Sequence, residues 1–150
     1  MPETGVNPLN TNSSPGAAPS WRVEGWLNTD DALSLEKLEG KVVVLHAFQM
    51  LCPGCVSHGL PQAQRVHDSF DHDKVSVIGL HTVFEHHEAM TPAALKAFVH
   101  EYRLTFPIGI DRPNGSGAPK TMTAYQMQGT PTLILIDKRG RLRRQIFGQC

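Results

Sequence analysis

The chain has 150 residues, of which 40% are hydrophobic and 19% charged, and this suits one globular domain that buries a single core. Fourteen basic and fourteen acidic residues cancel, so no summed field favours a nucleic acid or an anionic membrane as partner. No apolar run approaches the roughly 20 residues of a membrane helix, and the first residues lack the charged-then-apolar order of a secretory signal, so we expect a cytoplasmic protein without a membrane span.

The first 20 residues differ in composition from the remainder of the chain. They contain four proline, two glycine, three serine and three asparagine residues, with too few large apolar groups to offset the entropy lost on ordering. Large apolar residues recur from Trp21 onward, and no later stretch resembles a linker. We therefore predict a disordered tail over residues 1–20 and one folded domain over residues 21–150.

The first strongly patterned segment is KVVVLHAF, residues 41–48. It is rich in β-branched residues and too short for a typical helix, which predicts a strand covered on both faces. Cys52 and Cys55 follow it, and beyond them apolar residues recur at helical spacing up to Phe70, with Pro61 as an expected kink. The two cysteines therefore lie at a predicted strand-to-helix junction.

A second buried strand is predicted over VSVIGLHTV, residues 75–83. After it, Thr91 as N-cap and Pro92 at the first helical position predict the start of a helix. The apolar face of this helix is formed by Leu95, Phe98, Val99 and Tyr102.

The last third of the chain has four more elements. We predict an extended segment over 106–111, a short helix over 119–127 that ends before Gly129, and a strand over 130–137. A turn over KRG, residues 138–140, joins that strand to a closing strand of a hairpin. The order of these elements predicts an α/β sheet with a parallel centre and an antiparallel edge.

The motif CPGC, residues 52–55, has the chemistry of a redox pair. Unpaired N–H groups at a helix N-terminus stabilise an anion by about 0.3 to 1 kcal/mol, and by about 2 kcal/mol when partly buried. One pKa unit is about 1.4 kcal/mol, so such a helix end brings a thiol from about 8.5 to near 7. Cys52 is the predicted nucleophile, and Cys55, one helical turn further on, is the predicted resolving thiol.

Other uses of the pair stay open at this point. A structural zinc site needs four ligands, and Cys150 and histidines would have to complete it, because the chain has only three cysteines. The pair could also be inert thiols in a non-catalytic binding module. Haem attachment is excluded, because Val56 rather than histidine follows the second cysteine.

GTPT, residues 129–132, adds a Thr-Pro pair directly before an apolar strand. Together with GKVVVLHAF and CPGC, it makes residues 26–148 resemble thioredoxin-like proteins of the TlpA and redoxin (AhpC/TSA-related) group. The resemblance implies a thioredoxin-like α/β fold, a central mixed sheet with flanking helices, and a thiol–disulfide oxidoreductase without cofactor or metal. It also implies a cis bond that places Pro131 against the cysteines, with Thr130 binding an extended substrate.

Departures from that family are informative. His46 stands where thioredoxins have a buried Asp, and it is either a proton acceptor for Cys55 or a satisfied core histidine. Leu51 replaces the usual Trp and predicts an aliphatic, substrate-facing lip. Gln49 stands where peroxiredoxins need Thr or Ser, which disfavours a thiol peroxidase, the alternative function. His58 stands where some TlpA-type reductases have Glu, and it receives no role.

Two polar clusters are expected to be solvated. LHTVFEHHE, residues 80–88, places three histidines beside two glutamates, and we predict a loop without metal because adjacent histidines converge poorly on one ion. KRGRLRR, residues 138–144, is predicted to be a basic sheet edge that discourages strand pairing rather than a nucleic-acid site.

The sequence stops directly after the closing strand, where thioredoxin-like domains usually have a further helix. We therefore expect that helix to be lacking, with an exposed apolar strip over residues 142–147 that supports a homodimer. Cys150 is expected to be an incidental terminal thiol. The expected partners are protein or small-molecule disulfides and thiols, together with an electron donor or acceptor.

Overall fold

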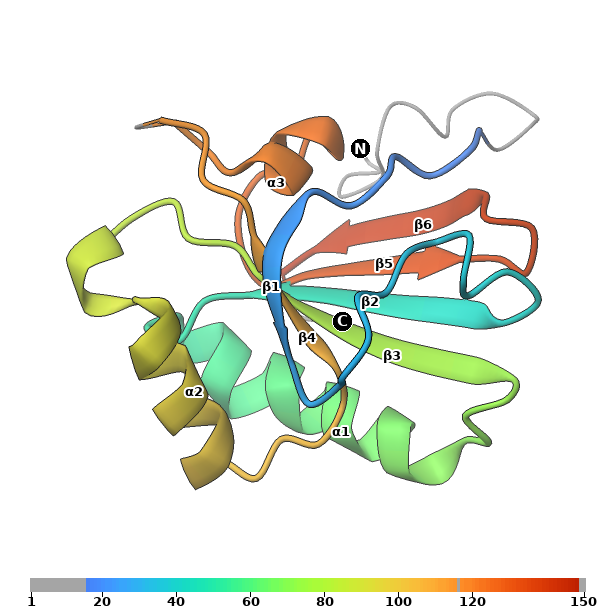
Figure 1. The fold of residues 1–150 in the computed structure, drawn as a ribbon, viewed down its shortest axis with the longest axis horizontal. Helices are drawn as coiled ribbons and strands as arrows, with labels where there is room; N and C mark the ends of the chain where they lie inside the picture. Colours follow the sequence, from blue (N-terminus) through green and yellow to red (C-terminus); the bar gives the residue numbers. More distant parts are fainter. Residues whose placement is uncertain (1–15, 116, 149–150) are drawn as a thin grey trace.

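The computed structural model describes residues 16–115 and 117–148, which fold around one six-stranded sheet of order β1-β4-β3-β2-β5-β6 (Figure 1). The strands are β1 Val23–Leu27, β2 Val42–Phe48, β3 Val75–His81, β4 Ile108–Asp111, β5 Thr132–Ile136 and β6 Leu142–Phe147. The helices are α1 Leu60–Ser69, α2 Pro92–Glu101 and α3 Lys120–Ala124, with a π-helical turn over Cys55–Gly59 and a 3₁₀ turn over His87–Ala89.

The pairing of the strands confirms the predicted mixed sheet. β2 and β3 are parallel, as are β3 and β4, whereas β5 is antiparallel to both β2 and β6. β1, which the sequence pattern did not reveal, is antiparallel to β4. Its register shifts between Val23 and Gly25, and such an irregularity breaks the two-residue alternation by which a half-buried strand is recognised.

Apolar residues cover both faces of the sheet. Val44 and Phe48 of β2 pack in one cluster with residues of α1 and α2, and Leu45 and Ala47 pack in a second cluster with Tyr125 beside α3. Figure 1 shows α1 and α2 on one side of the sheet and α3 on the other. Because side chains alternate along a strand, His46 points to the α1 side, toward the turn that carries Cys55.

The helix after the cysteines differs from the prediction. Residues 53–69 are helical without a break, but Cys55–Gly59 forms a π-helical turn rather than part of a kinked α-helix, and Pro61 follows it at the start of α1. The irregular turn lies directly before the proline, whose missing N–H leaves the preceding helical turn one hydrogen bond short. Phe70, predicted on the buried face, is 54% exposed because the chain is already extended there. The helix after Thr91 is confirmed, and Thr91 accepts a hydrogen bond from Ala94 N.

The predicted apolar strip on β6 is wrong. Leu142 is buried in the second core cluster, and Gln145 is buried with its Nε2 donating to Tyr125 O. Arg143 and Arg144 are exposed, so the open positions of this strand are mostly charged. No helix follows β6 within the described residues, which end at Gly148, and the homodimer stays a prediction.

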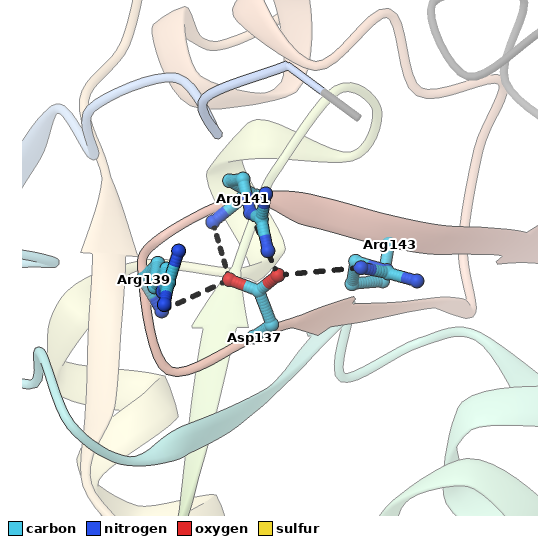
Figure 2. A network of polar contacts seen from close by, with 4 residues as sticks. All are labelled: Asp137, Arg139, Arg141 and Arg143. Atoms are coloured by element: carbon cyan, nitrogen blue, oxygen red, sulfur yellow. Dashed lines mark hydrogen bonds and ion pairs between the residues drawn. The ribbon is translucent and has the colours of Figure 1, made fainter. Parts of the chain in front are cut away.

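The basic hairpin between β5 and β6 is organised by one carboxylate (Figure 2). Asp137 Oδ1 accepts from the backbone N–H groups of Arg139 and Arg141, each at 2.9 Å, and Oδ2 accepts from Arg141 Nε at 3.0 Å. Arg143 Nη1 lies 3.6 Å from the same Oδ2. The arginines therefore serve the turn itself, as expected of a solvated edge.

The predicted boundary at residue 20 falls inside a segment that is attached to the sheet. Ala17 forms a bridge with Arg141, and Pro19 O accepts a hydrogen bond from Tyr125 Oη at 2.6 Å. Residues 1–15 and Cys150 lie outside the described residues, so the predictions for them stay predictions. None of the helices in the described part of the chain is both long and apolar enough to cross a membrane.

Candidate active site

The cysteine pair lies where β2 gives way to the π-helical turn, as predicted. Cys52 is half-buried and Cys55 is fully buried, and both are free thiols. Cys52 N donates to Gln49 O at 3.2 Å, and Cys52 Sγ accepts from Cys55 N at 3.3 Å. The first thiol is therefore open to a substrate, and the second lies behind it.

The loop before β5 lies against this pair. The Thr130–Pro131 bond is cis, which confirms the prediction, and Cys52 Sγ donates to Thr130 O at 3.5 Å. A β-carbon placed on Gly54 would lie 3.5 Å from Pro131 Cδ, so the CPGC turn and the proline ring are in ordinary van der Waals contact. The structure thus brings together both cysteines, Thr130 and Pro131, which are about 80 residues apart in sequence.

Burial changes the acidity of the second thiol, Cys55. Burial raises the pKa of the Cys55 thiol to about 12, and its interaction with Cys52 adds to the rise. Backbone and side-chain hydrogen bonds from Gln49 and Thr130 oppose that rise without cancelling it. Cys55 is therefore a protonated thiol at neutral pH and is not the thiolate, the reactive form of cysteine, that starts an exchange.

His46 lies beneath the turn that carries Cys55. Its side chain is 2% exposed, and a β-carbon at Gly59 would lie 2.6 Å from His46 Cε1. Neither ring nitrogen has a hydrogen-bond partner among the described residues. His46 is therefore not a core histidine with satisfied hydrogen bonds, which was one of the two expectations for it. Burial lowers the pKa of His46 to about 4, which makes the imidazole neutral and a weak base.

A small cavity lies beside His46. It is lined by His46, His58, Gln62 and Pro131, among others. His58 is exposed, so this residue, which received no role from the sequence, borders the space onto which the buried His46 opens.

Two exposed apolar side chains lie on the cysteine loop and beside the cis-proline loop. Leu51 is 58% exposed, which fits the predicted aliphatic lip. Phe147, at the end of β6, is 43% exposed, and its ring lies against Gly129, while Gly148 N donates to Pro131 O at 2.8 Å. The end of β6 thus borders the cis-proline loop, because residue 147 pairs with Thr132 across the sheet.

The histidines of residues 80–88 do not act together. His86 and His87 are exposed, but His81 is 1% exposed and its Nε2 accepts from Met50 N at 3.3 Å. Burial lowers the pKa of His81 to about 4. His81 therefore belongs to the packed base of the cysteine loop, and no metal-holding group of His, Cys, Asp or Glu occurs within residues 16–115 and 117–148.

Residues 16–145 match the sequence model of the AhpC/TSA family. The chain belongs to the AhpC/TSA family. Among curated relatives, the thiol-disulfide oxidoreductase ResA of Bacillus thuringiensis is 30% identical over 117 residues, which are 78% of this chain and 61% of the relative. The chain thus spans less than two thirds of the length of that relative.

Solved structures extend the comparison to the fold of this AhpC/TSA protein. A crystal structure of a thioredoxin-like superfamily protein has 58% identity and a TM-score of 0.89, covering 90% of this chain and 88% of that one. A thiol-disulfide isomerase from Corynebacterium glutamicum has 51% identity and a TM-score of 0.85, covering 89% of this chain and 88% of that one. These similarities confirm the predicted thioredoxin-like fold.

The sequence of this AhpC/TSA protein did not predict the contacts that two residues make in the site. Gln49 is 1% exposed, and its side chain contacts both Thr130 and Phe84; a polar residue so close to the first cysteine and directly after a buried strand was the available signal. Phe147 could not be found by counting outward from the hairpin turn: the register of β5 and β6 shifts by one residue between Leu135 and Ile136, so that Thr132 pairs with Phe147 rather than with Ile146.

Proposed function

We propose that this AhpC/TSA protein is a thiol–disulfide oxidoreductase that acts through Cys52 and Cys55. The observation that carries the proposal is the position of Cys52 Sγ, half-buried at the surface, 3.5 Å from Thr130 O and 3.3 Å from Cys55 N. The names of the similar ResA and isomerase proteins support the same activity.

In the reducing direction, the Cys52 thiolate attacks one sulfur of a substrate disulfide. The substrate S–S bond breaks, one substrate thiolate leaves, and a mixed disulfide joins Cys52 to the other substrate sulfur. Cys55 then attacks Cys52 Sγ and releases the second substrate thiolate. Two electrons pass to the substrate, the pair becomes a Cys52–Cys55 disulfide, and a dithiol donor restores it; the reverse sequence oxidises a substrate dithiol.

Cys55 has to lose its proton as it attacks, because burial holds it as a thiol. His46 is the proposed proton acceptor: its ring nitrogens are unpartnered, and it lies beside Gly59, one helical turn after Cys55. Burial makes it a weak base, so it would hold the proton only during the attack and pass it to the leaving thiolate or through the cavity toward His58.

Substrate binding is assigned to Thr130, Pro131 and Leu51. An extended segment can pair with the backbone of Thr130, as a strand adds to a sheet edge; the Thr130 carbonyl oxygen, which accepts from the Cys52 thiol, becomes available when that thiol ionises. Pro131 would form the floor beside the sulfur atoms, and Leu51 offers an apolar contact on the solvent side. Protein or small-molecule disulfides and thiols fit this surface.

The test compares single cysteine variants in the reduction of insulin disulfides by dithiothreitol. Cys52→Ser should abolish the catalysed rate, and Cys55→Ser should accumulate a mixed disulfide at Cys52 that is detected by mass spectrometry. Cys150→Ser is the control and should reduce insulin as the unaltered chain does. Unchanged turnover in Cys52→Ser would end the proposal, and consumption of hydrogen peroxide in preference to disulfides would favour a peroxidase.

A further inference from the structure

Gln49 occupies a buried position between three segments of the site. Its side chain is 1% exposed, its Oε1 accepts from Phe84 N at 3.1 Å, and its Nε2 lies 3.5 Å from Thr130 Oγ1 as donor. The amide thus joins the end of β2, the loop after β3 and the cis-proline loop. Burying an amide is unfavourable unless its polar atoms are bonded, and here both ends of the group have partners.

Hydrogen bonds link Gln49, Thr130 and the nucleophile Cys52 to one another. Cys52 N donates to the backbone O of Gln49 at 3.2 Å, the Gln49 side chain reaches Thr130 Oγ1, and Cys52 Sγ donates to Thr130 O at 3.5 Å. One residue therefore holds the backbone of Cys52 and the side chain of Thr130 at the same time. A shift of Gln49 would change the distance between the attacking sulfur and the Thr130 main chain.

Glutamine has the hydrogen-bonding groups that both contacts of residue 49 use. A glutamine amide carries an acceptor and a donor at the same end of the side chain, whereas an ionised glutamate can only accept and a methionine does neither usefully. Phe84 N needs the acceptor, and Thr130 is reached by the donor.

We propose that Gln49 is a positioning residue that holds Thr130 beside Cys52 and so determines how well an extended polypeptide disulfide binds; this rests on the proposed function. The amide touches neither the substrate nor a reacting atom, and it acts through Thr130. A polypeptide that pairs with the Thr130 backbone depends on this position. A small disulfide that reaches only Cys52 does not.

The experiment measures two disulfides with the full chain. Gln49→Met removes donor and acceptor with little change in volume, whereas Gln49→Glu keeps an acceptor for Phe84 N and, because a threonine hydroxyl can also donate, an acceptor for Thr130 Oγ1. Gln49→Met should raise KM for insulin by about threefold to tenfold, the effect of one hydrogen bond, with little change in kcat, and Gln49→Glu should raise KM less. The rate with 5,5′-dithiobis(2-nitrobenzoate), a small aromatic disulfide, should stay at the wild-type value.

Thr130→Val removes the same contact from the other side and answers the question if the Gln49 variants fail to fold. Because Gln49→Met and Thr130→Val both break the same interaction, the two combined should raise KM no more than Gln49→Met alone. Gln64→Met is the control: that amide also bonds a threonine, with Nε2 2.7 Å from Thr105 Oγ1 and Oε1 3.0 Å from Thr105 N, but it lies in no contact with the cysteine loop.

The results distinguish failure of the Gln49 positioning role from failure of the proposed oxidoreductase function. An unchanged KM for insulin in Gln49→Met, an equal loss with both disulfides, or additive effects of Gln49→Met and Thr130→Val would each overturn the positioning role. If the unaltered chain reduces neither disulfide, the proposed function fails first and this inference fails with it.

Discussion

Replacing Gly59 by alanine tests the packing beneath the cysteine turn. Gly59 has φ −63° and ψ −50°, an ordinary helical conformation, so the backbone itself does not require glycine. A β-carbon there would lie 2.6 Å from His46 Cε1, closer still to His46 Nε2, and 3.4 Å from Pro131 Cβ. Because His46 is 2% exposed, its imidazole has little room to move away.

The expected magnitude follows from this contact. An added methyl group in a packed core costs typically about 1 to 3 kcal/mol, which for a chain of this length lowers the unfolding midpoint by about 2 to 12 °C. In a helical position without such a clash, alanine is more favourable than glycine by about 0.5 to 1 kcal/mol. Gly59→Ala should therefore destabilise the unaltered protein but stabilise the His46→Ala variant.

The assay is thermal and urea unfolding of the four proteins of this double-mutant cycle under reducing conditions. Gly54→Ala is the matched control, because Gly54 directly precedes the π-helical turn and its backbone is also helical. The added β-carbon would lie at an ordinary 3.5 Å from Pro131 Cδ, so this variant should unfold at or slightly above the wild-type midpoint. Equal destabilisation by Gly59→Ala with and without His46 would refute the clash as the cause.

Three further results are expected. The folded pKa of about 12 for Cys55 lies above its ordinary 9.0, so the unfolded chain loses its proton first and the reduced protein should lose stability as pH rises from about 9 toward 12; urea titrations should show a flatter profile for Cys55→Ala. The folded pKa values of about 4 for His46 and His81 lie below 6.5, so the unfolded chain binds these protons first and stability should fall between about pH 6.5 and 4. His46→Leu should lose about half of that fall, and an unchanged profile would contradict the burial of a neutral imidazole. Asp137→Ala should lower the free energy of unfolding by about 1 kcal/mol, because it removes the acceptor of two backbone N–H groups in the hairpin. An unfolding midpoint equal to that of the wild type would contradict a stabilising role for the Asp137 contacts drawn in Figure 2.

The sequence by itself determined the elements whose signals are local. β2 and β3 were evident from their β-branched runs, and α2 from Thr91 and Pro92, which act within one turn of the helix. The two thiols at a strand-to-helix junction and the Thr-Pro pair before β5 were also readable, since each is a short motif next to a patterned strand. These features are fixed by neighbours in the chain, so a window of about ten residues contains their cause.

Only the tertiary structure decided which polar groups meet at the site. Gln49 contacts Thr130 across 81 positions of sequence, and His46 loses its hydrogen-bond partners because Gly59 and Pro131 close over it. No local pattern encodes such contacts, because they arise from the order in which strands are placed in the sheet. For the same reason β1 and the burial of Leu142 escaped prediction: both depend on partners that the sheet order and the packing on its faces supply.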